Sequence, residues 1–176
     1  MKKYLITLAI VVPLLIGCKA LNNLTKFDLP FSKSFTLPAL PVAGTPPALE
    51  IKGIETHIDS VLKSYNLSAD KIQSVTLTKM EFTLSSPADG DLSFLKSVEI
   101  FITAEGLDQV KIAGITNVPD GTKVLSLTAE DVDLKNFILK DKFGLKIVTT
   151  TDKKTDVEQK IDMDLNFLAD LKILGI

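Results

Sequence analysis

The feature that most constrains the fold is a strict alternation of apolar and polar residues near the C-terminal end of the chain. Between residues 157 and 169 the odd-numbered positions are apolar except for Gln159, and the positions between them are Glu158, Lys160, Asp162, Asp164, Asn166 and Leu168. Successive side chains of a strand point to opposite faces, so this pattern predicts a β-strand with one buried and one solvated face. Residues 143–151 form a similar segment, and the polar residues 152–155 between the two predict a hairpin.

Further strand patterns fill the middle of the chain, at 72–85, 98–104, 110–115 and 124–127. In the first of these the apolar positions slip by one residue near Thr78-Lys79, which predicts a β-bulge. Short spacings and turn-forming residues separate the segments. The sequence therefore predicts a mainly β fold: an antiparallel β-sandwich of the immunoglobulin-like or Greek-key type, with about seven strands and one or two short helices.

Two segments favour helices, and one favours a loop. Apolar residues recur at steps of three and four between 51 and 65, which predicts a helix of ten to fourteen residues, with a strand-like segment at 50–58 as the alternative. Thr128 and Asp131 have the spacing of a capping box, leading into a short helix or turn that carries Leu134, Phe137 and Ile138. The prolines between residues 38 and 47 predict an extended, irregular loop.

The N-terminal segment has the plan of a secretory leader. Lys2 and Lys3 precede an apolar run from Leu5 to Ile16, which is shorter than the roughly 20 residues of a membrane-spanning helix. The run ends in the four residues Leu15-Ile16-Gly17-Cys18, which resemble the lipobox of bacterial lipoprotein precursors. That resemblance implies cleavage before Cys18 and acylation of its thiol. Cys18 is the one cysteine of the chain, so a disulfide within the chain is excluded.

A lipid at Cys18 would determine where the protein is located. Two or three acyl chains together hold a protein firmly on a membrane, because each buried methylene contributes about 0.8 kcal/mol. Lys19 follows the cysteine, and the acidic run of surface-exported lipoproteins is absent, so the resemblance implies an outer-membrane anchor that faces the periplasm. We therefore predict a signal peptide at 1–17, a lipidated tether at 18–32 and a single sandwich domain at 33–176.

Composition argues against several functions. All twenty basic residues are lysine, and without Lys2 and Lys3 the remaining lysines are outnumbered by 22 acids. No basic cluster interleaved with aromatic residues is present, so we expect no nucleic-acid partner. No nucleophile motif or phosphate-binding loop occurs either. The sequence predicts no catalytic residue, no cofactor and no enzymatic activity.

A few residues remain as candidates for other chemistry. Asp89 and Asp91 flank Gly90 in a predicted turn and are the best guess for a calcium site, although turn residues are the commoner reading. The other acidic pairs are interpreted as a helix cap (Asp131 with Asp133) and a solvated strand face (Asp162 with Asp164). His57 is alone, without a second histidine or a nearby cysteine, and is predicted to be a surface residue.

The middle of the chain is also similar to small lipoproteins of unassigned function from Bacteroidota. Ser86-Pro87, residues 91–102 and residues 109–113 carry this resemblance, and it implies no activity.

Three functions stay open after these exclusions. The first is a lipid-anchored binding or assembly module with an envelope protein as its partner. The second is a carrier or chaperone for an apolar ligand, such as a lipid or an extended peptide. The third is a structural or adhesion component of the envelope. The apolar residues Phe27, Leu29, Phe31 and Phe35 either cover a sheet edge or line a groove for such a ligand.

Overall fold

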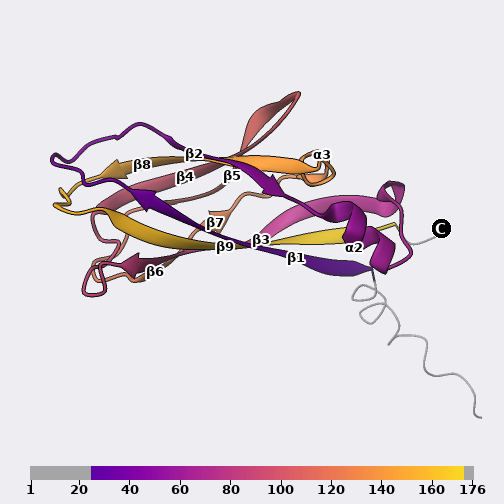
Figure 1. Ribbon diagram of the computed structural model, residues 1–176, viewed down its shortest axis with the longest axis horizontal. Coiled ribbons are helices and arrows are strands. Elements are labelled where there is room, and N and C mark those ends of the chain that lie inside the picture. The colour runs from indigo at the N-terminus through magenta and orange to yellow at the C-terminus, as the bar shows by residue number, and fades with distance from the viewer. Residues whose placement is uncertain (1–24, 173–176) are drawn as a thin grey trace, which may run out of the picture.

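Two antiparallel sheets face each other in the computed structural model, which describes residues 25–172 (Figure 1). Among these residues one sheet has the strand order β1-β9-β3-β6 and the other has the order β2-β8-β4-β5-β7. The strands are β1 (Lys26–Leu37), β2 (Leu49–Glu55), β3 (Ile72–Ser86), β4 (Leu95–Ala104), β5 (Leu107–Thr116), β6 (Val124–Ser126), β7 (Thr128–Ala129), β8 (Lys142–Thr151) and β9 (Gln159–Leu171). The predicted β-sandwich is confirmed, with seven longer strands and two very short ones in this part of the chain.

Three short helical segments accompany the sheets. Two are α-helices, α2 (Ile58–Ser64) and α3 (Lys135–Ile138), and one is a 3-10 turn, η1 (Ala69–Lys71). Figure 1 places α2 and α3 at the same end of the sandwich, where β1 begins and β9 ends. No helix among residues 25–172 is long and apolar enough to span a membrane.

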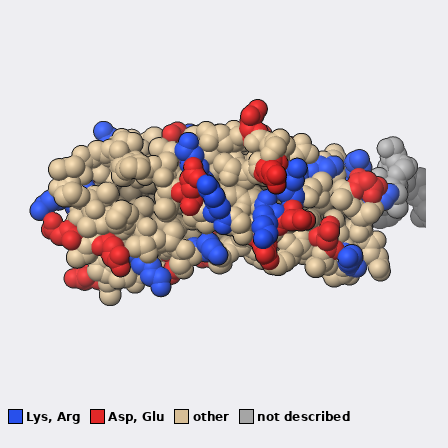
Figure 2. All heavy atoms as spheres, turned by 45° about the horizontal axis from the view of Figure 1, so that its top comes forward, with Lys and Arg blue, Asp and Glu red and all other residues tan. Residues whose placement is uncertain are grey.

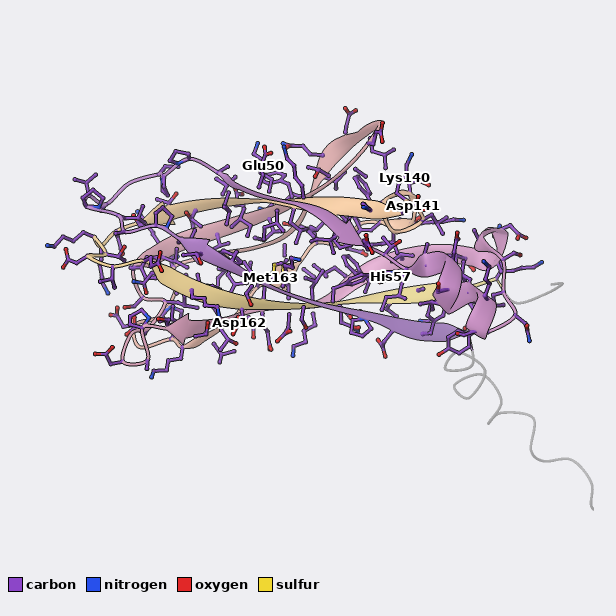
Figure 3. The ribbon with its side chains drawn as sticks, viewed as in Figure 1. Glu50, His57, Lys140, Asp141, Asp162 and Met163 are labelled. Carbon is purple, nitrogen blue, oxygen red and sulfur yellow. The ribbon has the colours of Figure 1, made fainter. Side chains whose placement is uncertain are left out.

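The core lies between the two sheets and follows the predicted alternation. On β9 the odd-numbered positions 161–169 are at most 2% exposed, whereas Asp164 is exposed and Asp162 partly so. In Figure 3 Met163 points between the sheets and Asp162 points away from them. Burial of one face of each strand is therefore what holds the layers together.

The first strand begins inside the predicted tether, before the predicted start of the domain. It begins at Lys26 instead of residue 33, and it pairs with β9 over its whole length, from Lys26↔Asp170 to Leu37↔Gln159. The boundary predicted at residue 32 between tether and domain therefore lies inside β1. Pairing with β9 explains the difference, because it orders residues that look like a linker in isolation.

The apolar residues of β1 fill the space between the sheets. Leu29 and Phe35 are buried, and the ring of Phe31 makes edge-to-face contacts with Phe143 and Phe167 at centroid distances of 5.4 and 5.7 Å. These residues therefore pack into the core, on a strand that itself forms the edge of its sheet, rather than covering an edge or lining a groove.

The predicted helix over 51–65 is half strand and half helix. Residues 49–55 form β2, and the helix begins only at Ile58, so the strand-like alternative for 50–58 is closer to the structure. A register shift between Ile51 and Ile54 marks a bulge, and Gly53 there has φ +70°. The bulge puts Ile54 on the buried side and so produces apolar spacing that imitates a helix.

The predicted hairpin between residues 143–151 and 157–169 is wrong in its pairing. Both strands exist, but β8 lies in the five-stranded sheet, and β9 pairs with β1 and β3 in the other one. Residues 152–158 therefore cross from sheet to sheet. In the part of the chain that the structure describes, β4 and β5 are the one pair of consecutive strands that are also neighbours.

The predicted capping box is also wrong, and the predicted bulge is right. Thr128 lies in β7, and it is Asp133 that accepts hydrogen bonds, from the amides of Val75 (2.9 Å) and Lys135 (3.0 Å). This carboxylate thus joins the start of α3 to β3. The register of β3 against β9 shifts between Leu77 and Lys79, where the change of phase predicts it.

The proline loop runs along the connection between β8 and β9. Leu40 pairs with Thr155 and Gly44 pairs with Thr151 through reciprocal backbone hydrogen bonds of 2.7–3.0 Å. The hydroxyl groups of the two buried threonines add further bonds to the same loop. Residues 38–48 are therefore held in an extended form at the end of the sandwich opposite to α2.

Candidate functional site

The predicted lipidation site, Cys18, and the predicted signal-peptidase motif before it lie outside the described part of the chain. Leu15, Ile16, Gly17 and Cys18 precede residue 25, where the described structure begins. The chain from Cys18 joins the domain at the start of β1, and this end also carries α2 (Figure 1).

The calcium candidates lie in a turn between β3 and β4. Asp89 is exposed, and the carboxylate of Asp91 accepts a hydrogen bond from the Ser93 amide at 2.8 Å. Hydrogen bonds from Ser93, together with Lys153 and Lys123, hold the pKa of Asp91 below its usual range. Within residues 25–172 no group of three or more His, Cys, Asp or Glu side chains is placed to hold a metal ion. Asp91 thus stabilises a turn.

The other candidate residues take surface positions. His57 precedes α2 in a left-handed conformation, its side chain is 71% exposed, and its Nε2 lies 3.6 Å from a carboxylate oxygen of Glu55. The carboxylate of Asp162 accepts a hydrogen bond from the Ser34 hydroxyl at 2.6 Å, and Asp164 accepts one from Ser32 at 2.5 Å. These pairs form a polar ladder on the outer face of β1 and β9, as predicted for a solvated face.

A depression of about 640 Å³ lies beside the bulge in β2. Its walls come from the bulge, from the start of β8 and from the β4–β5 hairpin, which projects from the body in Figure 1. Gly144 allows the strands to approach, since a Cβ there would lie 2.7 Å from Thr103 Oγ1. The lining residues are Lys52, Gly53, Thr103, Ala104, Glu105, Lys140, Asp141, Lys142, Phe143 and Gly144.

Charges of both signs surround this depression, and several are paired. Lys52 lies 2.8 Å from Glu50, and Lys142 lies 3.3 Å from Glu55. The hydrogen bond and the charge of each partner raise the pKa of Lys52 and lower that of Glu50. Figure 3 shows Glu50, Lys140 and Asp141 on this side of the molecule. The depression is suited to a polar ligand that exchanges hydrogen bonds with amines and carboxylates.

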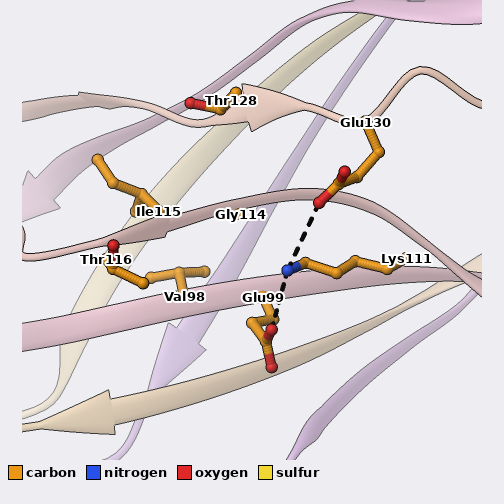
Figure 4. A pocket seen from close by; sticks show the side chains of 8 residues that line it. All are labelled: Val98, Glu99, Lys111, Gly114, Ile115, Thr116, Thr128 and Glu130. Carbon is orange, nitrogen blue, oxygen red and sulfur yellow. Dashed lines mark ion pairs between the residues drawn. The ribbon is translucent and has the colours of Figure 1, made fainter.

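A smaller depression of about 300 Å³ lies on the outer face of the same sheet, near β7 (Figure 4). The Lys111 amine bridges the carboxylates of Glu99 at 2.9 Å and Glu130 at 3.5 Å. The hydrogen bond to Glu99 is the main cause that raises the pKa of Lys111. Lysine and acid are again mixed, and Figure 2 shows no large area of a single sign on the face that it presents.

Sequence reasoning missed the residues around the larger depression. One signal was available, because an isolated glycine inside a strand pattern indicates a bulge, and Gly53 stands in such a place. Nothing in the sequence indicates that the bulge and the β4–β5 hairpin lie next to each other, since that follows from the strand order.

Comparisons with known proteins add little to this picture. No family model matches the chain, and no curated protein matches it. Two of the solved structures that it resembles are from Desmodium yellow mottle tymovirus (10% identity, TM-score 0.31, covering 99% of this chain and 98% of that one) and turnip yellow mosaic virus (12% identity, TM-score 0.30, covering 99% and 93%). Scores this low support no conclusion about function.

Proposed function

We propose that the chain is a lipid-anchored protein of the bacterial cell envelope that acts as a binding or assembly module, without enzymatic activity. The observation that carries the proposal is the sequence Leu15-Ile16-Gly17-Cys18 at the end of a short apolar leader. Acylation of Cys18 attaches the sandwich to a membrane, and the protein partner of the module is another component of the envelope. The membrane is the outer membrane, with the domain on the periplasmic side.

Charged side chains at the depressions are held in ion pairs, an arrangement that suits the binding of a polar partner. An acid–base catalyst needs a group whose pKa is moved toward neutral pH. At the two depressions the shifts go the other way: the pKa of Glu50 is lowered, and those of Lys52 and Lys111 are raised. These groups stay charged at neutral pH, as side chains that hold one another or a polar partner do.

The described depressions favour a polar partner over an apolar cargo. The larger one is lined by Lys52, Lys140, Lys142, Glu105 and Asp141, together with glycine, alanine and threonine. Its one aromatic lining residue, Phe143, is only 2% exposed, since its ring packs in the core. A carrier for a lipid tail would need an apolar lining, because burying a charge next to a hydrocarbon chain is unfavourable.

The anchor is tested by replacing Cys18 in the full-length protein. The wild-type protein should incorporate labelled palmitate and remain in the membrane pellet after carbonate extraction. Cys18→Ser should lose the label and appear in the soluble fraction, whereas the control Lys19→Ser should behave as the wild type. Retention of Cys18→Ser in the carbonate pellet, correctly cleaved and without label, would refute the anchor, and separation of inner from outer membranes assigns the membrane.

Native mass spectrometry of the mature protein tests the choice between module and carrier. A mass equal to that of the acylated polypeptide supports the module. A co-purified lipid, lost on denaturation, would instead establish the carrier.

A further inference from the structure

An exposed tyrosine packs against a partly buried phenylalanine at the end of the sandwich where the described chain begins. The rings of Phe27 on β1 and Tyr65, which ends α2, have centroids 5.5 Å apart. Tyr65 is 59% exposed and is one of the few large apolar or aromatic side chains exposed to this extent in residues 25–172. Backbone hydrogen bonds join the segments at this end, since the Leu171 amide donates to the Thr25 carbonyl (2.7 Å) and the Lys172 amide donates to the Lys71 carbonyl (2.8 Å).

Lysines and acids both occur in the segments that meet at this end of the sandwich. Lys26 and Lys63 are close in sequence to Phe27 and Tyr65, and Lys71 and Lys172 belong to the segments that meet here. Lys26 lies 3.8 Å from Asp170, and Lys71 lies 3.6 Å from Asp70, so the net charge of this end is small. An exposed tyrosine beside lysines is the combination found at membrane–water interfaces, where the ring lies at headgroup level and the amines stay in water.

The reach of the tether decides which end of the domain is close to the membrane. Six residues lie between Cys18 and Thr25, and the seven residue steps from one to the other span at most about 25 Å. The twelve residues of β1 extend over about 40 Å and lead to the loop 38–48 at the opposite end. The tether is therefore shorter than the strand that follows it.

We propose that the end of the sandwich carrying Phe27 and Tyr65 docks on the lipid headgroups of the membrane that anchors the chain. Docking leaves the opposite end, with the loop 38–48, facing away from the bilayer and accessible to a protein partner. This inference rests on the proposed lipid at Cys18, and it adds the surface that contacts the lipid and the orientation of the domain.

The composition of the chain provides a direct test. The sequence contains no tryptophan and two tyrosines, Tyr4 and Tyr65, so Tyr65 is the one tyrosine of a mature chain that begins at Cys18. The mature protein is coupled through the Cys18 thiol to a maleimide lipid in phosphatidylcholine vesicles, with or without phosphatidylcholine brominated on its acyl chains. Brominated lipid should quench the fluorescence of Tyr65.

A matched variant reports on the opposite end. Val42, in the loop 38–48, is 75% exposed, so Val42→Tyr with Tyr65→Phe moves the single tyrosine there without disturbing the core. Its fluorescence should be unaffected by brominated lipid. In a second control, the chain is anchored through Val42→Cys in a Cys18→Ser background, and Tyr65 should then keep its fluorescence.

Three outcomes would overturn the orientation: no quenching of Tyr65, equal quenching of the tyrosines at positions 65 and 42, or quenching of Tyr65 from the anchor at position 42. Chemical coupling replaces the cellular modification in these experiments. Failure of the docking is therefore distinguishable from failure of Cys18 to become acylated in cells.

Discussion

The strands β8 and β9 follow each other in the chain and share the same alternation, yet they have different surroundings. Each is central in its own sheet: β9 lies between β1 and β3, and β8 lies between β2 and β4. Along β9 the partner β1 keeps its register over twelve pairs, and the outer face is a ladder of hydrogen bonds between hydroxyl groups and carboxylates. Along β8 the partner β2 bulges at Lys52 and Gly53, and a depression forms beside it.

The difference shows that the alternation determines which face of a strand is buried, whereas the partner strand determines what the outer face can do. A regular partner gives a flat, hydrogen-bonded surface. A bulged partner leaves backbone groups unpaired by the ladder and opens a concave surface. Only the second arrangement provides the depth that a binding site needs.

The largest effect is expected on the buried face of β9. Ile161 is 0% exposed, so Ile161→Asp buries an unpaired charge and should cost about 4 kcal/mol or more, close to the whole stability of a small domain. Lys160→Asp, one residue away on the solvated face, should change the free energy of unfolding by less than about 0.5 kcal/mol. Urea denaturation measures both. Equal costs would contradict the inward and outward assignment on which the comparison rests.

A smaller effect is expected where β8 meets the bulge. A Cβ at position 144 would lie 2.7 Å from Thr103 Oγ1 and 3.0 Å from the Ile51 carbonyl oxygen, so Gly144→Ala should cost about 1–3 kcal/mol through crowding. Gly53→Ala meets no atom within 4 Å, but φ is +70° there, so it should cost about 1–2 kcal/mol through backbone strain alone.

A second substitution distinguishes crowding at position 144 from backbone strain at position 53. Thr103→Ala removes the hydroxyl that a Cβ at position 144 would meet, so it should recover part of the stability lost by Gly144→Ala and none of that lost by Gly53→Ala. A double-mutant cycle in urea gives the two coupling energies. A similar coupling energy for both glycines would contradict the close approach of position 144 to Thr103 in the wall of the depression.

The sequence predicts each buried face well because alternation is local. The inward side of residues 161–169 and the bulge near Thr78-Lys79 were predictable, since each depends on neighbouring residues alone. The partner of each strand was not predictable, because β8 and β9 each bury one face whether they pair with each other or lie in opposite sheets. The turn-forming residues 152–155 are compatible with a hairpin and with a crossing between sheets.

The candidate site illustrates the same limit. The depression depends on the meeting of Gly53 in β2, Gly144 in β8 and Thr103 in β4, which are far apart in sequence. Around Gly53 the bulge changes the spacing of apolar residues from that of a strand to that of a helix. The local pattern therefore predicts a helix where the chain forms a strand. The proposed lipidation at Cys18 is a different case, because the motif that predicts it is local to the leader and depends on no fold.

The smallest effect is expected on the outer face of β9. The Ser34 hydroxyl donates to the carboxylate of Asp162 at 2.6 Å in an exposed position, where water competes for both groups. Ser34→Ala should therefore cost about 0.5 kcal/mol or less, below the usual net contribution of a hydrogen bond. Asp162→Asn keeps an acceptor and should cost less still, and urea denaturation of the two single variants and the double variant gives their coupling. A coupling energy above about 1 kcal/mol would mean that the ladder stabilises the sheet as strongly as a buried hydrogen bond does. That result would contradict the contrast between a structural inner face and a merely solvated outer face of β9.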